Sequence, residues 1–555
     1  MKVFCNPLNL SYRYQIHKGS SGIYACREAA DPSVVLFRGR YYLFASMSLC
    51  AWGSDDLVTW EEISLPGDLP LMDYAPDVCV RDGWLWFCAS RGGAPILHYR
   101  TRDVEKGPYE CVPGTYEGVD PNRFVDEDGR VYFYWGCSDR TPIWGMELNP
   151  ETMLPVSEPV PLIEGHPDVI GYERSPGLPG RKPYIEGAWM TKHDGRYYLQ
   201  YATPGTQFAT YADGVYVSDA PLGPFRLAEN NPYSFYPSGF FPGAGHGSTL
   251  TDPEGAVWHF ATMRLSVRHM FERRVGLYPA GFDRDGELFC NQRYADWPQD
   301  VERLREDPFA KPLWMPQHLG ASVRASSHTP GHEAELAVSE DVQTFWEAGT
   351  ADPGEYLLLD LGEWVCLHAV QINFADGKPD ISRFEGKVKG DRLIDPGPQR
   401  TAYLLEGSRD GTDWFVLADR TRTQTDCPHD FCVFEEGIDL RYVRLSRMEL
   451  PYSQKPCVSG LRLFGIGSGE VPEEPTFEVR RTGDTELTVR VEKQEDALGW
   501  NMLFGHAPDK LYHSCLIFSH GETRLDALVK GQDCYVRLDA FNRAGIREGS
   551  RIIKL

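Results

Sequence analysis

Three acidic residues lie where a turn or loop meets a strand-like segment. Asp31 and Asp120 each precede a proline, in ADPSVV and VDPNRFV, and Glu186 lies in KPYIEGAW. An Asp before Pro most often forms a turn. The apolar flank of Glu186 would desolvate a buried carboxyl and keep it protonated towards neutral pH. An ionised carboxylate and a carboxyl that keeps its proton are the two groups that general acid–base catalysis requires.

The elements that must position these residues recur in the first 300 residues. A glycine turn leads into an aromatic strand at RGRYYLFAS, RDGWLWFCAS, DEDGRVYFYWG, KHDGRYYLQYA and DPEGAVWHFAT. The turn glycines, Gly39, Gly83, Gly129, Gly195 and Gly255, are 44, 46, 66 and 60 residues apart. This spacing suits one four-stranded unit per repeat and predicts a five-bladed β-propeller. A β-sandwich with coincidental hairpins is the alternative.

A propeller would bring equivalent positions of its repeats together at the central axis. Asp31, Asp120 and Glu186 would then share one pocket. Carboxyl groups that share a pocket favour glycoside hydrolysis, in which an acid protonates the leaving oxygen and a carboxylate activates water.

Composition excludes several classes of partner. The chain has 555 residues, enough for two to four domains, and a net charge of −24. The negative charge opposes binding to nucleic acids and to anionic membranes. The N-terminus MKVFCNPLNLSYRYQ has no apolar signal-peptide core, and no run of eighteen apolar residues occurs. We therefore expect a cytoplasmic protein without a membrane partner.

The fourteen cysteines are irregularly spaced, as is typical of small buried hydrophobic residues. Cys427 and Cys432, with His429 between them, form the tightest pair. A zinc site there lacks a second pair of ligands at suitable spacing.

Five segments, in this order over roughly residues 5–300, resemble glycoside hydrolase family 43: ADPSVV, YAPDV, VDPNRFVDEDGRVYFYWG, YIEGAW and GHGSTL. The resemblance implies an inverting glycosidase. By position, Asp31 matches the general base, Asp120 the carboxylate that orients and tunes the acid, and Glu186 the general acid. Inversion requires about 6.5–9.5 Å between acid and base, which leaves room for a water molecule.

The same resemblance assigns substrate-binding residues. Tyr74 replaces the tryptophan that usually begins the motif of Asp77, which changes the expected sugar-stacking surface, and Trp189 is a second aromatic candidate. Asp77 itself is expected to bond within its own blade. Arg273 resembles the arginine that bonds hydroxyls of the terminal sugar, and Arg274 and Arg264 are alternatives.

His246 matches a family histidine that points into the central channel near a calcium ion or a water molecule. Calcium prefers oxygen ligands, so waters would complete its shell. The resemblance implies no other cofactor.

Two further domains follow the predicted propeller of residues 1–300. Residues 301–319 form a proline-punctuated linker. Residues 320–467 resemble a discoidin-type β-sandwich related to carbohydrate-binding module family 32, and residues 468–555 resemble a fibronectin type III domain. The framework residues of the discoidin-like segment are Trp346, Asp360, Leu361, Gly362, Trp414 and Arg444. The predicted fold class is thus all-β, a five-bladed β-propeller followed by two β-sandwich domains.

The sequence favours an exo-glycosidase that releases a terminal β-xylosyl or α-L-arabinofuranosyl unit from short oligosaccharides. A β-galactofuranosidase or another family 43 specificity is the first alternative. A non-catalytic carbohydrate-binding propeller would lack at least one catalytic acid, whereas all three are present. A metal-dependent deacetylase would need several converging His and Asp ligands. The oligomeric state is not predicted.

Overall fold

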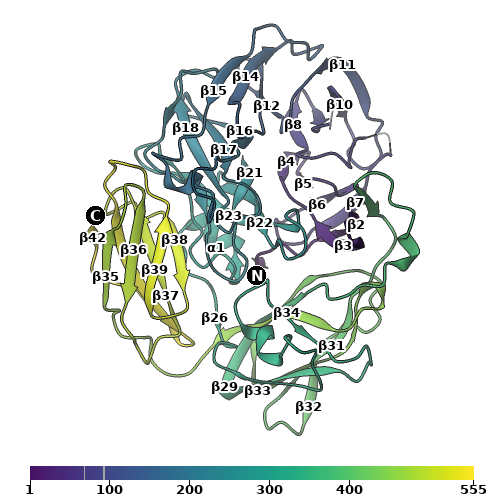
Figure 1. The fold of residues 1–555 in the computed structure, drawn as a ribbon, viewed down its shortest axis with the longest axis vertical. Coiled ribbons are helices and arrows are strands. Elements are labelled where there is room, and N and C mark those ends of the chain that lie inside the picture. Colours follow the sequence, from purple (N-terminus) through teal and green to yellow (C-terminus); the bar gives the residue numbers. More distant parts are fainter. Residues whose placement is uncertain (68, 92–93) are drawn as a thin grey trace.

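The computed structural model describes residues 1–67, 69–91 and 94–555, and almost all its regular structure is β. Five blades, each with four consecutive antiparallel strands, surround a central axis (Figure 1). Their strands are Ser33–Phe37, Arg40–Phe44, Cys50–Ser54 and Glu61–Ser64 (β4–β7); Asp77–Arg81, Trp84–Cys88, Ile96–Thr101 and Glu110–Tyr116 (β8–β11); Asn122–Val125, Val131–Trp135, Ile143–Leu148 and Val160–Ile163 (β12–β15); Glu186–His193, Arg196–Thr203, Ala212–Ser218 and Arg226–Leu227 (β16–β19); and Gly245–Thr251, Val257–Arg264, Arg273–Phe282 and Leu288–Cys290 (β21–β24).

The first strands of the five blades form a closed ring. β4, β8, β12, β16 and β21 contact one another in this order, and β21 returns to β4. Each predicted turn glycine lies in the hairpin between the first two strands of its blade, with a positive φ. The aromatic second strands are largely buried between neighbouring blades, where side chains that favour strands pack well. The predicted propeller is therefore confirmed.

The N-terminal strands extend the fifth blade. β2 (Arg13–Gly19) and β3 (Gly22–Glu28) form a hairpin, and β3 pairs in parallel with β23 at Glu28 and Arg273. β1 (Val3–Phe4) pairs with β25 (Gln299–Asp300), and β20 (Ser234–Phe235) pairs with β18. A short 3-10 helix, η1 (Gly171–Glu173), precedes the fourth blade.

The predicted linker contains regular structure. It begins with α1 (Val301–Glu306), whose first turn is capped by the Asp300 carboxylate, and it includes β26 (Met315–Pro316). β26 pairs with a strand of the next domain. Among the described residues, no helix has the length and apolar character needed to span a membrane.

An eight-stranded sheet forms the second domain, with a core around Trp346, Leu367 and Leu463. Besides β26, its strands are Ser322–Ala325 (β27), Trp346–Glu347 (β28), Tyr356–Phe374 (β29), Ala402–Ser408 (β31), Trp414–Asp419 (β32), His429–Glu449 (β33) and Cys457–Ile466 (β34). Three 3-10 turns accompany them: Ala334–Val338 (η2), Ser382–Phe384 (η3) and Pro451–Ser453 (η4). One strand of this segment, β30 (Arg392–Asp395), leaves the domain and pairs with β2 of the propeller.

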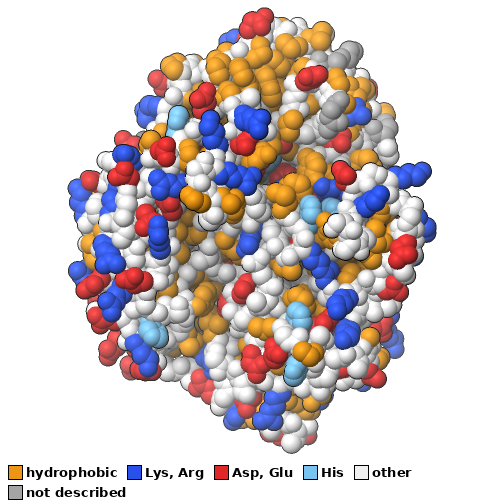
Figure 2. All heavy atoms as spheres, in the orientation of Figure 1, with side chains coloured by type: hydrophobic (Ala, Val, Ile, Leu, Met, Phe, Trp, Pro, Cys, Tyr) orange, Lys and Arg blue, Asp and Glu red, His pale blue; other side chains and the backbone are white. Residues whose placement is uncertain are grey.

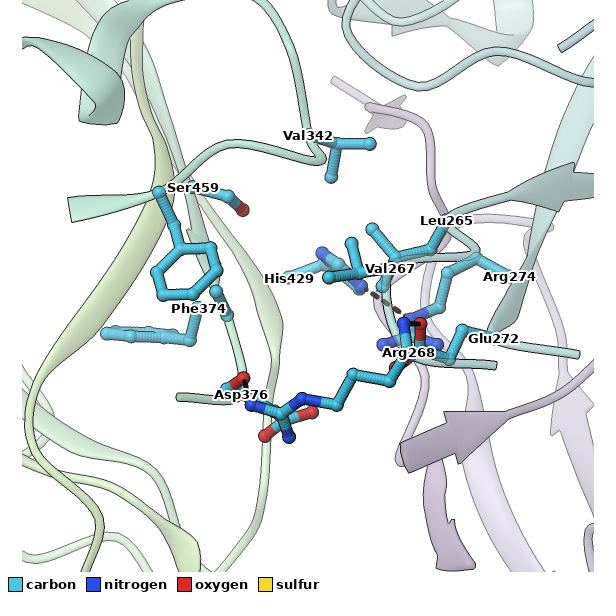
Figure 3. A pocket seen from close by; sticks show the side chains of 12 residues that line it. Leu265, Val267, Arg268, Glu272, Arg274, Val342, Phe374, Asp376, His429 and Ser459 are labelled. Atoms are coloured by element: carbon cyan, nitrogen blue, oxygen red, sulfur yellow. Dashed lines mark hydrogen bonds between the residues drawn. The ribbon is translucent and has the colours of Figure 1, made fainter. Parts of the chain in front are cut away.

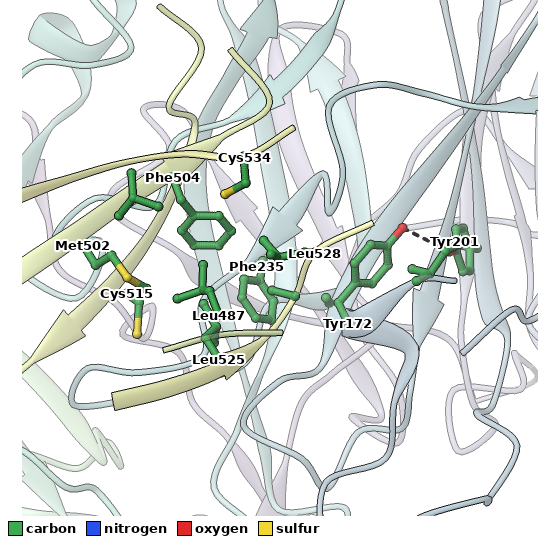
Figure 4. Packing of buried hydrophobic residues seen from close by; sticks show 14 of the residues in the cluster. Tyr172, Tyr201, Phe235, Leu487, Met502, Phe504, Cys515, Leu525, Leu528 and Cys534 are labelled. Atoms are coloured by element: carbon green, nitrogen blue, oxygen red, sulfur yellow. Dashed lines mark hydrogen bonds between the residues drawn. The ribbon is translucent and has the colours of Figure 1, made fainter. Parts of the chain in front are cut away.

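Two facing sheets form the third domain and pack against the fourth blade. One sheet contains Phe477–Arg481 (β35), Glu486–Val491 (β36) and Gly521–Asp526 (β39); the other contains Gly499–Gly505 (β37), His513–Ile517 (β38), Tyr535–Asn542 (β40), Gly545–Arg547 (β41) and Ile553–Lys554 (β42). Their core continues through Leu528 and Phe235 to Tyr172 and Tyr201 of the propeller (Figure 4). This domain therefore braces the propeller.

Candidate active site

The predicted catalytic residues lie at equivalent ends of the first strands. Asp31 and Asp120 come two residues before β4 and β12, Glu186 begins β16, and His246 is the second residue of β21. The closed ring of strands therefore brings them to one end of the central channel. Figure 2 shows a hollow over the middle of the propeller, bordered by hydrophobic side chains.

Asp31 is buried and both of its carboxylate oxygens have donors. Arg273 Nη1 donates to Oδ1 at 2.9 Å, and the Ser46 hydroxyl donates to Oδ2. The backbone φ is 52°, and the Asp31 N–H is held by Thr262 Oγ1 at 2.8 Å. Burial alone would raise the pKa of Asp31, but the charges of Arg273 and His246 and the hydrogen bonds hold it below its ordinary value of 3.8. Asp31 is thus held ionised, as a general base must be.

Glu186 is half-buried, and within the described part of the chain the groups that donate hydrogen bonds to it are uncharged. The Tyr211 hydroxyl donates to Oε1 at 2.7 Å, and the Cys137 thiol donates to Oε2 at 3.1 Å. Neither partner forms an ion pair with the carboxyl group. This environment contrasts with that of Asp31, which faces a buried guanidinium.

Asp120 is close enough to both other acids to feel their charges. Its N–H donates to Ser90 Oγ at 2.8 Å, and one of its oxygens lies within 4.8 Å of both Cys137 Sγ and a Glu186 oxygen. Burial raises the pKa of Asp120 to about 7, and the negative charges of Glu186 and Asp31 act in the same direction, against the opposing effect of His246. Asp120 therefore holds a proton up to about neutral pH.

His246 faces two carboxylates. Its Nδ1 lies 3.3 Å from Asp31 Oδ1 and 3.9 Å from Asp120 Oδ2. Burial lowers the pKa of His246, but the nearby carboxylates outweigh this and leave it above 6.5. The ring lies over Gly187, where a Cβ would approach His246 Cγ to 2.7 Å and where φ is +60°, so this position requires glycine.

Two of the predicted catalytic carboxylates, those of Asp31 and Asp120, face the imidazole of His246. Neither group of described side chains that could hold a metal ion includes His246: they are Asp120, Cys137 and Glu186, and Glu229, Glu287 and His506. Calcium near His246 stays a prediction, and no step proposed below uses a metal ion. Cys427 and Cys432 also lie outside these groups, and both nitrogens of His429 face Arg274 and Asn373.

Of the three candidate arginines, Arg273 is the one that contacts the acids. It is buried and pairs with both Glu28 and Asp31. Arg274, the next residue of the same strand, points to the opposite face and donates to His429. Arg264 donates to the Gln207 carbonyl and to Gln343.

The two aromatic candidates occupy different places. Tyr74 is half-buried, and its ring lies 5.5 Å from that of Phe271. The Trp189 indole donates to the Thr249 carbonyl at 3.1 Å, which ties β16 to β21. Sugar binding by Tyr74, Trp189 or Arg273 stays a prediction.

Asp77 bonds within its own blade, where the Cys88 thiol donates to Oδ2 at 3.9 Å, and it also bonds the neighbouring blade. The Arg123 guanidinium donates to Asp77 Oδ2 at 2.9 Å, and Asn122 donates to Oδ1 at 3.1 Å. Both partners lie on β12 of the third blade. Asp77 therefore holds two inner strands together.

Several residues of the site had no distinguishing signal in the sequence. Glu28, Ser46, Cys137 and Tyr211 contact the acids directly or through Arg273. In the structure, Gly245 leaves room for the Tyr211 ring, since a Cβ at Gly245 would approach this ring to 2.8 Å.

The model of the glycosyl hydrolases family 43 matches residues 26–288, which contain all of these acids and His246. Residues 26–288 are a family 43 domain. Curated relatives include the β-D-galactofuranosidase xynD of Aspergillus niger, 25% identical over 43% of this chain and 74% of that protein. A β-xylosidase of Xylanibacter ruminicola is 26% identical over 35% of this chain and 77% of that protein. Xylosidase/arabinosidase 43A of Humicola insolens is 25% identical over 47% of this chain and 95% of that protein. The family 43 domain and these relatives support a glycosidase function, but the relatives differ in the sugar that their names give.

Proposed function

We propose that this protein is an inverting exo-glycosidase that releases a terminal β-xylosyl or α-L-arabinofuranosyl unit from short oligosaccharides. The observation that carries the proposal is the contrast among three clustered carboxyl groups. Asp31 is held ionised by Arg273 and Ser46, whereas the raised pKa of Asp120, beside Glu186, lets Asp120 retain a proton. Glycoside hydrolysis with inversion needs one group of each kind.

In the proposed reaction, Asp31 removes a proton from a water molecule as the water attacks the anomeric carbon. Glu186 gives its proton to the leaving oxygen, and the glycosidic bond breaks. Asp120, beside Glu186, shares the proton that the acid transfers, and Tyr211 and Cys137 fix the orientation of the acid. His246 and Arg273 balance the negative charge around Asp31.

A β-galactofuranoside is the second candidate substrate, because the relative from Aspergillus niger is named a β-D-galactofuranosidase. A pentosyl unit and a hexofuranosyl unit differ by little more than a hydroxymethyl group. Discrimination by one such group is worth only about 1–3 kcal/mol, so residue types alone do not choose between them. The proposal also includes the other two domains, which are discoidin-like and fibronectin-like and support the propeller.

The experiment that tests the proposal is hydrolysis of nitrophenyl β-D-xylopyranoside, α-L-arabinofuranoside and β-D-galactofuranoside, with the anomer of the first product followed by NMR. We expect one glycoside to be cleaved well ahead of the others, with inversion at the anomeric carbon. Retention would refute the assignment of Asp31 as a base. Absence of cleavage of these glycosides and of xylo- and arabino-oligosaccharides would favour the non-catalytic binding protein.

The pKa values predict the pH profile of kcat/KM for a substrate whose leaving group needs protonation. Asp31 stays ionised to below pH 3.8, so the acidic limb should lie below that value. The pKa of Asp120 is raised to about 7, so kcat/KM should fall above about pH 7 as Asp120 loses the proton that it shares with the acid. Rates measured from pH 3 to 9, with circular dichroism at each pH, test this. A profile that stays level to pH 9 would contradict it.

A further inference from the structure

One strand of the second domain lies beside the active site. β30 pairs with β2, and its register sets Arg392 opposite His17 and Asp395 opposite Tyr14. β2 and β3 form the hairpin that ends at Glu28, and Glu28 in turn pairs with β23 at Arg273. The second domain thus reaches the propeller three strands away from the arginine that holds Asp31.

A chain of charged contacts joins Arg392 to the proposed base. Arg392 Nη1 donates to Glu28 Oε2 at 3.1 Å, and Arg273 donates to Glu28 Oε1. Arg273 also donates to Asp31 Oδ1 at 2.9 Å. Glu28 is fully buried, so its charge must be balanced by these two arginines. With Arg392 in place, Arg273 is shared between Glu28 and Asp31.

A second route leads from Arg392 to the other oxygen of the base. The Arg392 guanidinium lies over the Tyr74 ring, 5.0 Å from its centre. The next residue, Ala75, donates its N–H to Ser46 Oγ at 2.7 Å, and Ser46 donates to Asp31 Oδ2. Arg392 therefore supports the donors of both carboxylate oxygens.

The segment that carries Arg392 is fixed to the propeller at its start as well. Asp376 follows the end of β29 and accepts a hydrogen bond from the Tyr14 hydroxyl at 2.6 Å and an ion pair from Arg27 at 3.3 Å. Figure 3 shows Arg268 of the propeller reaching towards Asp376 beside a pocket that residues of the two domains line. Such buried contacts argue against a mobile accessory module.

We propose that Arg392 of the second domain is a positioning residue of the glycosidase site, which holds Glu28 and Tyr74 so that Arg273 and Ser46 keep Asp31 in place. The kinetic effect expected of Arg392 rests on the proposed function. The positions of Glu28, Arg273 and Asp31 that Arg392 is expected to maintain do not depend on that function. This role of Arg392 makes the second domain a part of the active site in addition to any sugar binding of its own.

The test is Arg392→Met, which keeps the length of the side chain but removes the charge and the donors. Glu28 then has only Arg273 to balance it and draws the guanidinium away from Asp31. The charged groups that face Asp31 are Arg273 from β23, His246 from β21 and the Asp120 carboxylate. Weaker pairing of Asp31 with Arg273 should shift the acidic limb of the kcat/KM profile to a higher pH by about one unit. Misplacement of the base should lower kcat by about 10- to 100-fold with little change in KM.

Arg392→Lys keeps the charge without the planar fork and should recover part of kcat and of the acidic limb. The matched control is Arg383→Met, since Arg383 lies on the same segment, stacks over Tyr452 and pairs with Asp395 rather than Glu28. Its kcat and acidic limb should equal those of the wild type. An Arg392→Met enzyme with wild-type kcat and pH profile would overturn the inference while leaving the proposed function intact.

A crystal structure of Arg392→Met gives a second readout that needs no activity. The expected result is that Arg273 pairs with both oxygens of Glu28 and loses the contact with Asp31. If Glu28, Arg273 and Asp31 keep the wild-type arrangement, the inference is wrong, whether or not the wild type hydrolyses any glycoside.

Discussion

Asp31→Asn should lower kcat/KM by about 10²- to 10⁴-fold on every substrate, whatever its leaving group. The amide has nearly the shape of the carboxylate, so the contacts of the backbone N–H with Thr262 and of Oδ2 with Ser46 can persist. It cannot accept the proton of the attacking water, and it leaves Arg273 without one of its two anionic partners. Water is the nucleophile for good and poor leaving groups alike, so kcat/KM should fall for every substrate.

The measurement is kcat/KM for one nitrophenyl glycoside and one oligosaccharide. Asp126→Asn is the matched control, because Asp126 is also a buried propeller aspartate that accepts hydrogen bonds, from Tyr197 and Lys192, and it follows the opposite end of β12 from Asp120. Its kcat/KM should stay within a few-fold of wild type even if the melting temperature falls. Activity of Asp31→Asn close to that of the control would remove Asp31 from the mechanism.

The propeller was predictable because its signals are local and repeated. A glycine turn followed by an aromatic strand can be recognised within about ten residues, and five copies specify the architecture. Once the architecture is known, the convergence of Asp31, Asp120 and Glu186 follows from their equivalent places before or at the first strand of a blade. The prediction of the acidic cluster thus depended on the repeat of equivalent positions from blade to blade.

The partners of these acids were not predictable in the same way. Tyr211 reaches Glu186 from the loop before β18, and Glu28 reaches Asp31 only through Arg273. These contacts depend on how side chains and loops pack in three dimensions, for which no turn or strand pattern gives a signal. Asp77 illustrates the same limit, since its sequence neighbours do not reveal that Arg123 of the next blade is its partner.

The contact between Arg392 and Glu28 was also not predictable from the sequence. Arg392 and Glu28 are 364 residues apart, and the segment between β29 and β31 reads as a polar connection. Its short strand pairs with another domain, so alternation within its own domain could not identify it. An interdomain strand of four residues is defined by its partner rather than by its sequence.

Glu186→Gln should separate substrates by the acidity of their leaving groups. Hydrolysis of xylo- or arabino-oligosaccharides should fall by about 10²- to 10⁴-fold, because the sugar oxygen must be protonated as the bond breaks. A dinitrophenyl glycoside leaves as a stable anion, so its kcat/KM should fall by less than about tenfold. The glutamine side chain can keep the hydrogen bond from Tyr211, which preserves the site geometry.

The control for this separation is Glu173→Gln. Glu173 is likewise a propeller glutamate, buried and bonded by a tyrosine hydroxyl, with Tyr201 donating at 2.6 Å. Because its partner Tyr201 lies in the core shared with the third domain, loss of the Glu173 charge should affect both substrate classes equally and mainly lower the melting temperature. For Glu186→Gln, equal losses on oligosaccharide and dinitrophenyl glycoside would contradict the role of general acid. The expected result is a loss of activity on the oligosaccharide alone, together with a pH profile for the dinitrophenyl substrate that stays level above pH 7. This result would assign the transferred proton to Glu186, since only the step that needs this proton would have been removed.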